Sequence, residues 1–164
     1  MIENYSFNEP YKRFEPHETK CTYCGEAHMK TMQDCYFIPL FVTNDRTNII
    51  VYSSVSYSKI LIGIPRCSSC RNIHETSSSK AIWIGVGVAI AGIAFLVYNF
   101  MSLPPMVTII GFFAVIFGAV FGSQKLTETF VANHDIYTKR DGAETNEVVR
   151  DLVLAGWSFK QPTA

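Results

Sequence analysis

Four of the five cysteines in this chain fall into two Cys-x-x-Cys pairs, Cys21 with Cys24 and Cys67 with Cys70. Each pair lets one tight turn present two sulfur atoms to the same ion, and two such pairs complete the ligand set of tetrahedral zinc. Gly25 directly follows the first pair, where a zinc knuckle turns through a positive φ. The spacing therefore predicts that these four cysteines bind one structural zinc ion per chain.

Two other chemistries use the same motif. Thioredoxin-like redox proteins carry Cys-x-x-Cys at the start of a helix within a longer α/β pattern, which is missing around these pairs. An iron–sulfur cluster is also held by four thiolates. Four cysteines fill tetrahedral zinc completely, so no open position for hydrolysis is expected. The lone Cys35 is predicted to be a buried small residue, and three histidines near the pairs are expected at the surface or beside the sulfurs: His17, His28 and His74.

The segment between the two pairs must contain structure of its own. Residues 36–42, 49–57 and 60–64 are rich in β-branched and aromatic residues and are separated by polar turns, which predicts a three-stranded meander. Pro39 within the first of them predicts an edge strand or a bulge. Residues 1–18 mix aromatic and charged side chains without a period, which predicts an irregular N-terminal arm.

With a knuckle before a β-hairpin and a second cysteine pair after it, residues 20–74 resemble the zinc-ribbon and treble-clef group of domains. The resemblance implies a treble clef if Cys70 lies in the first turn of a helix, and a ribbon if the second pair forms another knuckle. The layout is also similar to bacterial membrane proteins with a cytoplasmic zinc module before a helical hairpin. Such modules are mostly structural or bind partners, so the resemblance implies no specific activity.

Two apolar segments, 81–101 and 104–122, contain no charged residue. Each is close to the roughly 20 residues that a helix needs to cross a bilayer core. The short join with Pro104 and Pro105 favours a sharp reversal between helices. Residues 81–122 are therefore predicted to form a transmembrane hairpin.

Basic residues flank this hairpin on both sides and are missing from its loop. The positive-inside rule then places both termini in the cytoplasm, as in an integral protein of the inner (cytoplasmic) membrane. Because that compartment keeps thiols reduced, the paired cysteines favour metal binding over disulfides. Neither span carries an ionisable residue, which argues against a transporter.

The C-terminal segment, 123–164, contains one further periodic stretch. Val148, Leu152 and Ala155 repeat at helical spacing, so 147–155 is predicted as a short amphipathic helix that docks on the zinc module. The complete prediction is an α+β membrane protein with a small zinc-stabilised β-meander module. Its parts are the arm 1–18, the zinc module with a linker 19–80, the hairpin 81–122 and the cytoplasmic segment 123–164. Residues 71–80, which lead into the membrane, can form a helix or a short polar linker.

Charge and motifs narrow the function. The 14 basic and 14 acidic residues balance, which argues against nucleic-acid binding, and no phosphate loop, His-Glu-x-x-His or Gly-x-Ser-x-Gly motif suggests an enzyme. We expect a non-enzymatic, membrane-anchored adaptor whose partners are the lipid bilayer and a protein. The alternative is a membrane effector whose soluble module controls oligomerisation or permeability of the hairpin, and small residues in both spans are compatible with a homo-oligomer. A thiol- or metal-handling factor is the weaker alternative.

Overall fold

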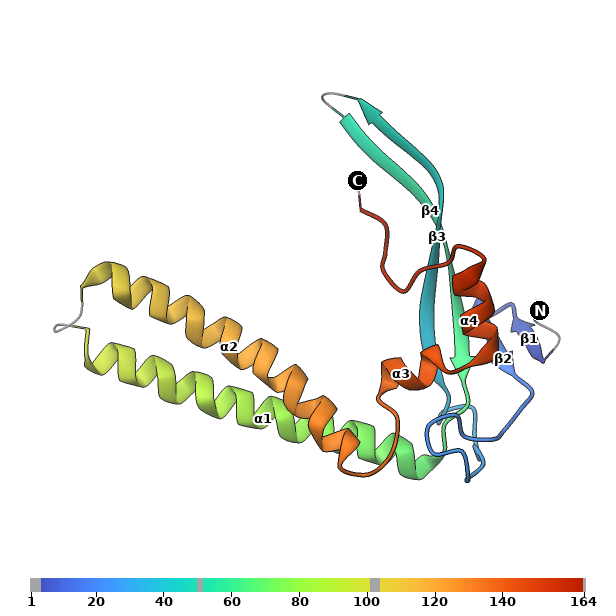
Figure 1. Ribbon diagram of the computed structural model, residues 1–164, viewed down its shortest axis with the longest axis horizontal. Coiled ribbons are helices and arrows are strands. Elements are labelled where there is room, and N and C mark those ends of the chain that lie inside the picture. The colour runs from blue at the N-terminus through green and yellow to red at the C-terminus, as the bar shows by residue number, and fades with distance from the viewer. Residues whose placement is uncertain (1–3, 50–51, 101–103, 164) are drawn as a thin grey trace. The chain divides into compact units, whose positions relative to one another are not determined.

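The computed structural model describes residues 4–49, 52–100 and 104–163, and it contains a sheet and four helices within those ranges (Figure 1). The chain divides into two compact units. The first unit combines Met1–Arg71 with Tyr137–Ala164, and the second unit consists of Asn72–Ile136. Residues 137–164 of the C-terminal segment therefore belong to the same unit as the N-terminal module, whereas residues 123–136 belong to the second unit.

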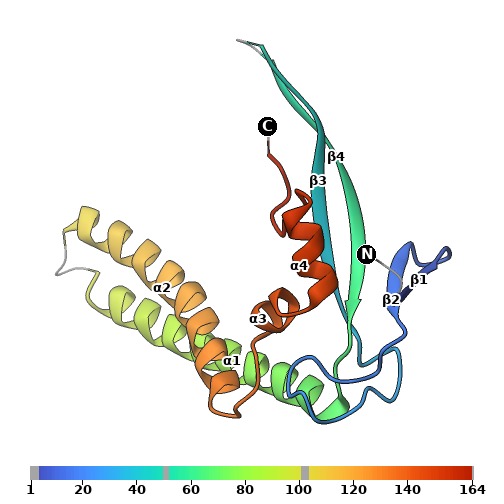
Figure 2. The same ribbon diagram turned by 45° about the vertical axis from the view of Figure 1, so that its right-hand side comes forward.

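The first unit is built on a four-stranded sheet in the order β1-β2-β4-β3. The long antiparallel hairpin of β3 and β4 can be followed in Figures 1 and 2. A short antiparallel hairpin of β1 and β2 joins it through one parallel pairing, Phe14 with Ile62. The strands are β1 (Tyr5–Asn8), β2 (Arg13–Pro16), β3 (Tyr36–Ile49) and β4 (Tyr52–Ile64).

The predicted three-stranded meander is wrong, because its two polar turns are parts of strands. Residues 43–48 continue β3 through a register shift between Thr43 and Asp45, and Ser58 pairs with Val42 inside β4. Polar side chains bond across this hairpin, as Asn44 Nδ2 does to Ser58 Oγ at 2.8 Å, so pairing overrides their preference for turns. The last pairing of the two strands is that of Ile49 with Tyr52, and residues 50–51, which belong to the second predicted strand, lie outside the described residues. β3 is an edge strand, as Pro39 predicts.

The N-terminal arm is not irregular, since it contains β1 and β2, which pair as an antiparallel hairpin. Its aromatic residues pair across the short hairpin: the rings of Phe7 and Phe14 lie 5.0 Å apart. The Arg13 guanidinium lies 4.6 Å from the ring centre of Tyr11 and 4.1 Å from that of Phe37. These cross-strand contacts stabilise strands too short for a clear alternation to appear in the sequence.

The C-terminal segment folds against the sheet and the cysteine loops. It contains α3 (Lys139–Glu144) and α4 (Glu147–Leu154), and Asn146 Oδ1 caps α4 by accepting from the backbone N–H groups of Val148 and Val149. Gly156, at φ 98°, ends α4. The Trp157 N–H then donates to the Leu152 carbonyl at 3.0 Å, which closes a Schellman turn. Beyond it, Ser158 and Phe41 of β3 exchange two backbone hydrogen bonds.

The second unit consists of α1 (Ser68–Tyr98), from Asn72 onward, and α2 (Pro105–Ala132), both long and apolar enough to cross a membrane. No proline or glycine interrupts residues 68–84, so residues 71–80, for which the sequence leaves a helix or a linker open, are helical and belong to α1. Residues 101–103, the end of that span and part of the predicted join, lie outside the described residues.

The glycines of these two helices differ in what they face: some lie against the other helix, and others face open space. A Cβ on Gly92 would lie 2.8 Å from Val115, and one on Gly111 would lie 3.0 Å from Leu96, so both glycines permit close packing between the helices. A Cβ on Gly85 would lie 3.1 Å from the Ala119 carbonyl oxygen. Gly118 and Gly122 of α2 do not pack against α1, since a Cβ on either of them would meet no atom within 4 Å.

Cys35 predicts how the stability of the first unit depends on pH. Its thiol is buried, as expected from sequence, and donates to the Ile64 carbonyl at 3.3 Å, and burial raises its pKa to about 12. Above pH 9 the Cys35 thiol ionises in the unfolded chain but keeps its proton in the folded chain, and this favours unfolding. The contribution of this thiol to the free energy of unfolding is therefore fully present below pH 9 and is lost as the pH rises towards 12. A serine hydroxyl does not titrate between pH 9 and 12. We therefore expect Cys35→Ser to reduce the loss of unfolding free energy over this range by up to about 4 kcal/mol. Guanidinium unfolding at several pH values, followed by Trp157 fluorescence in a Trp83→Phe background, measures this loss. Parallel pH profiles of unfolding free energy for the wild type and Cys35→Ser would contradict the prediction.

Candidate metal centre

The two cysteine pairs lie on neighbouring loops of the first unit. Cys21 and Cys24 lie after β2 in a tight loop, in which the Gly25 N–H donates to the Cys21 carbonyl at 2.9 Å. Gly25 has φ 72°, the positive value expected of the residue after a knuckle. Cys67 directly precedes α1, and Cys70 lies in the first turn of that helix.

The structure brings all four predicted ligand residues together. Their sulfur atoms lie within 4.8 Å of one another, and the Sγ atoms of Cys24 and Cys67 are 3.9 Å apart. A tetrahedral ion with sulfur ligands at about 2.3 Å separates its ligands by about 3.8 Å, so this spacing fits such an ion. All five cysteines are free thiols. Within the described ranges this is the one cluster of metal-ligating side chains found.

The pKa values of three of these thiols, Cys21, Cys24 and Cys70, are shifted by their surroundings. Burial raises the pKa of Cys21 and of Cys70. Burial acts in the same direction on Cys24, but backbone N–H groups of Ala27 and Glu26 donate to its sulfur and lower its pKa to about 7. Without a cation, the two deeply buried sulfurs keep their protons. A metal ion such as zinc would replace those protons and stabilise four adjacent thiolates, so this donor set could bind a metal ion.

A buried carboxylate that sequence reasoning missed supports the start of α1. Asp34 is buried and accepts from Thr31 Oγ1 at 3.2 Å, while the Arg71 guanidinium lies 3.5 Å from its other carboxylate oxygen. The Arg66 side chain donates to the Asp34 carbonyl at 3.1 Å. Asp34 thus ties the loop before β3 to the residues on both sides of Cys67 and Cys70. Its position beside a lone cysteine gave no signal in the sequence.

The three histidines lie outside the four-sulfur cluster. His28 shares a hydrogen bond of 3.2 Å with Thr19 Oγ1, and both His17 and His28 are exposed. His74 is buried on α1, one helical turn after Cys70, rather than at the surface. None of the three is needed to complete a four-ligand site.

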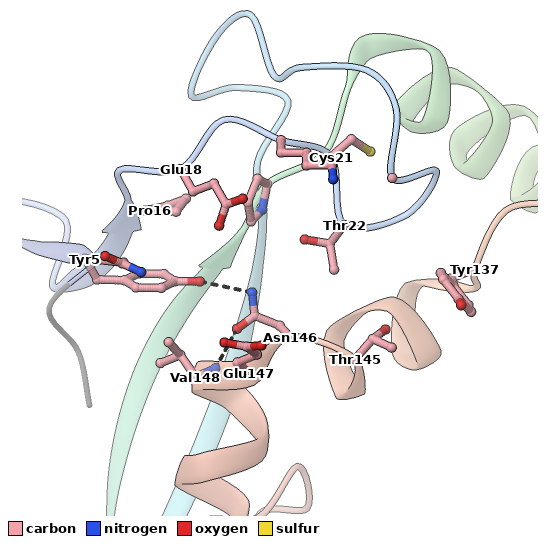
Figure 3. Close-up of a pocket in the computed structure, with 14 residues that line it drawn as sticks. Tyr5, Pro16, Glu18, Cys21, Thr22, Tyr137, Thr145, Asn146, Glu147 and Val148 are labelled. Atoms are coloured by element: carbon pink, nitrogen blue, oxygen red, sulfur yellow. Dashed lines mark hydrogen bonds between the residues drawn. The ribbon is translucent and has the colours of Figure 1, made fainter.

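A polar cavity of about 350 Å³ adjoins the first cysteine pair (Figure 3). Its walls come from separate stretches of the first unit, which include the N-terminal hairpin with Tyr5, the loop with Glu18 and Thr22, Pro65 after β4, Tyr137 before α3, and the start of α4. Asn146 Nδ2 donates to the Tyr5 hydroxyl at 3.3 Å across it, and burial raises the Tyr5 pKa to about 12. Because these walls are far apart in sequence, no local pattern predicts the cavity.

Comparisons with protein-family models, with curated proteins and with solved structures gave no match for this chain. The resemblance to zinc-ribbon and treble-clef domains therefore stands on the cysteine spacing and on the positions of the four sulfurs. Those positions make a metal-binding module the chemistry that this site supports best.

Proposed function

We propose that this chain is a membrane-anchored, non-enzymatic adaptor that presents a zinc-stabilised protein-binding module at the cytoplasmic face of a membrane. The observation that carries the proposal is the position of the four thiols at the start of α1, the helix whose later residues form the first apolar span. One helix therefore contributes both a metal ligand and a membrane anchor.

Zinc is the metal that suits this module. Four thiolates, no open coordination position and a cytoplasmic compartment favour a structural ion, whose binding contributes on the order of 10 kcal/mol to folding. A unit with so small a core needs such a contribution. Cys70 in the first turn of α1 favours the treble-clef arrangement over the ribbon.

Insertion of α1 and α2 in a bilayer explains the side chains that they expose. Trp83 is 73% exposed, Phe95 is 65% exposed and Phe117 is 56% exposed, and similar apolar residues cover both helices. Such a surface is unfavourable in water and favourable in lipid, where a helix satisfies its own backbone hydrogen bonds. The positive-inside rule, applied to the flanking basic residues, favours both termini in the cytoplasm.

The cavity beside the first cysteine pair is the proposed protein-recognition surface. It combines acceptors and donors from Glu18, Thr22 and Glu147 with the ring of Tyr5, a mixture typical of protein interfaces. The metal loops and α4 hold its walls, so loss of the metal would also disturb it.

A pair of charge reversals tests the adaptor. Glu18 is exposed and lines the cavity, whereas Lys30 is exposed on the next loop and does not line it. We expect Glu18→Arg to weaken recovery of a cross-linked protein partner from membranes by about tenfold, and Lys30→Glu to leave recovery unchanged. Zinc near one per chain in the same sample is part of the expected result. Absence of any partner whose recovery depends on Glu18 would contradict the proposal, and depolarisation of the membrane on expression would favour the effector instead.

A further inference from the structure

A groove of about 480 Å³ runs between α1 and α2. One face of each helix lines it, with Ile82 and Val86 on α1 and with Ile116 and Ser123 on α2, at the spacings that place residues on one side of a helix. All of its lining residues belong to the second unit, so the groove is a property of the helical hairpin itself.

The two ends of this groove differ in polarity. Hydroxyl and amide side chains line one end, and branched aliphatic side chains line the other. The change falls between Ser78 and Ile82 on α1 and between Ser123 and Val120 on α2. On both helices this is where the charge-free span begins or ends, so in the proposed membrane placement the groove crosses from the headgroup layer into the hydrocarbon.

The polar end of the groove accepts hydrogen bonds and carries no charge. Ser123 Oγ donates to the Val120 carbonyl at 2.8 Å, and Thr127 Oγ1 donates to the Ser123 carbonyl at 2.9 Å. Both hydroxyl protons are therefore used within α2, and the oxygen lone pairs remain as acceptors. No charged residue is among the described residues that line the groove, and the adjacent Lys125 is paired with Glu128 at 2.8 Å.

We propose that this groove binds one ethanolamine phospholipid, with an acyl chain along the apolar end and the ammonium group donating to the hydroxyl oxygens of Ser123 and Thr127. The amide of Gln124 and the hydroxyl of Ser78 supply donors for its phosphate. A choline headgroup has no N–H to donate, and an anionic headgroup meets no cation in the groove lining. The proposal rests on the proposed membrane insertion of α1 and α2.

Lipid retention by the full-length chain tests the proposal. The protein is reconstituted with equal amounts of ethanolamine and choline phospholipids, extracted in mild detergent and weighed by native mass spectrometry. We expect one retained lipid per chain, enriched for ethanolamine by at least about fivefold, the preference that either of the two hydrogen bonds from the ammonium group supplies by itself. Equal retention of the two lipids, or a mass of two chains without lipid, would overturn it.

Three variants separate the groove from the rest of the hairpin. Ala89→Trp fills the apolar end and is expected to abolish retention, whereas Val88→Trp, at a site 59% exposed that does not line the groove, is expected to leave it unchanged. Ser123→Ala with Thr127→Val is expected to keep the lipid but to lose the ethanolamine preference. A preference that survives both groove variants would contradict the assignment. Resistance to carbonate extraction is measured on the same membranes: protein that is extracted refutes membrane insertion and the groove together, and protein that resists without a lipid preference refutes the groove alone.

Discussion

Replacing Cys24 with serine is expected to unfold the metal-binding loops of the first unit and to leave membrane insertion of α1 and α2 intact. Cys24 contributes one of four sulfurs that lie within 4.8 Å of one another. Loss of a side chain that merely orients a ligand costs 10- to 100-fold in metal affinity, so loss of a ligand is expected to cost more than about 100-fold. Because metal binding is linked to folding, this corresponds to about 3 kcal/mol or more of lost stability.

Three measurements on the Cys24→Ser protein check this expectation. Zinc per chain falls well below that of the wild type, residues 20–74 become accessible to protease, and the protein still resists carbonate extraction. Cys35→Ser is the matched control, because Cys35 is buried in the same unit but lies outside the sulfur cluster. A Cys24→Ser protein with the wild-type protease pattern would rule out a structural metal, whereas parallel loss of both variants would point to general fragility of the unit.

The cluster of four cysteines was predictable because its signal is local. Two residues between the members of each pair are enough to place two sulfurs on one turn, and Gly25 marks the turn by its need for positive φ. The long apolar helices were predictable for the same reason, since length and lack of charge are read along the chain. The loops of the two pairs lie side by side, and a hydrogen bond joins them: the Thr22 N–H donates to the Pro65 carbonyl at 3.0 Å.

The sheet and the cavity depend on contacts between distant residues. Residues 43–48 are typical of a turn, yet they continue β3 because they pair with β4 along its length. The arm 1–18 contains the aromatic pair Phe7 and Phe14, but only their meeting across a hairpin makes strands of it. The cavity needs Tyr5 and Asn146 side by side, and no pattern in a single sequence relates those positions.

Gly142 illustrates a contact that sequence alone cannot reveal, and its substitution is expected to reverse the usual effect. Alanine in place of glycine inside a helix normally stabilises by up to about 1 kcal/mol. In α3, however, a Cβ at position 142 would lie 2.5 Å from Cδ1 and from Cε1 of the Tyr23 ring. We therefore expect Gly142→Ala to destabilise the first unit by about 2 kcal/mol, as in an overpacked core.

The Tyr23 ring cannot easily yield to the added methyl group. It is 1% exposed, its hydroxyl donates to the Lys139 carbonyl at 3.4 Å, and its own carbonyl accepts from the Tyr137 N–H at 3.2 Å. The helix must move instead, which loosens Tyr137–Ala164 from the loop of Cys21 and Cys24, in which Tyr23 lies. Guanidinium unfolding followed by Trp157 fluorescence in the Trp83→Phe background measures the loss.

A double-mutant cycle with Tyr23→Leu separates this clash from other effects of the Gly142 substitution. Leucine removes the ring atoms nearest position 142, so the alanine is expected to cost at least about 1 kcal/mol less in that background. The same cycle reports on the metal centre, because Tyr23 lies between Cys21 and Cys24. If Gly142→Ala also lowers zinc retention, packing of α3 on Tyr23 stabilises the loop of Cys21 and Cys24. Residues 137–164 then contribute to the stability of the metal site as well as lying beside it. Stabilisation by Gly142→Ala, or an equal cost in both backgrounds, would show that α3 does not pack on Tyr23.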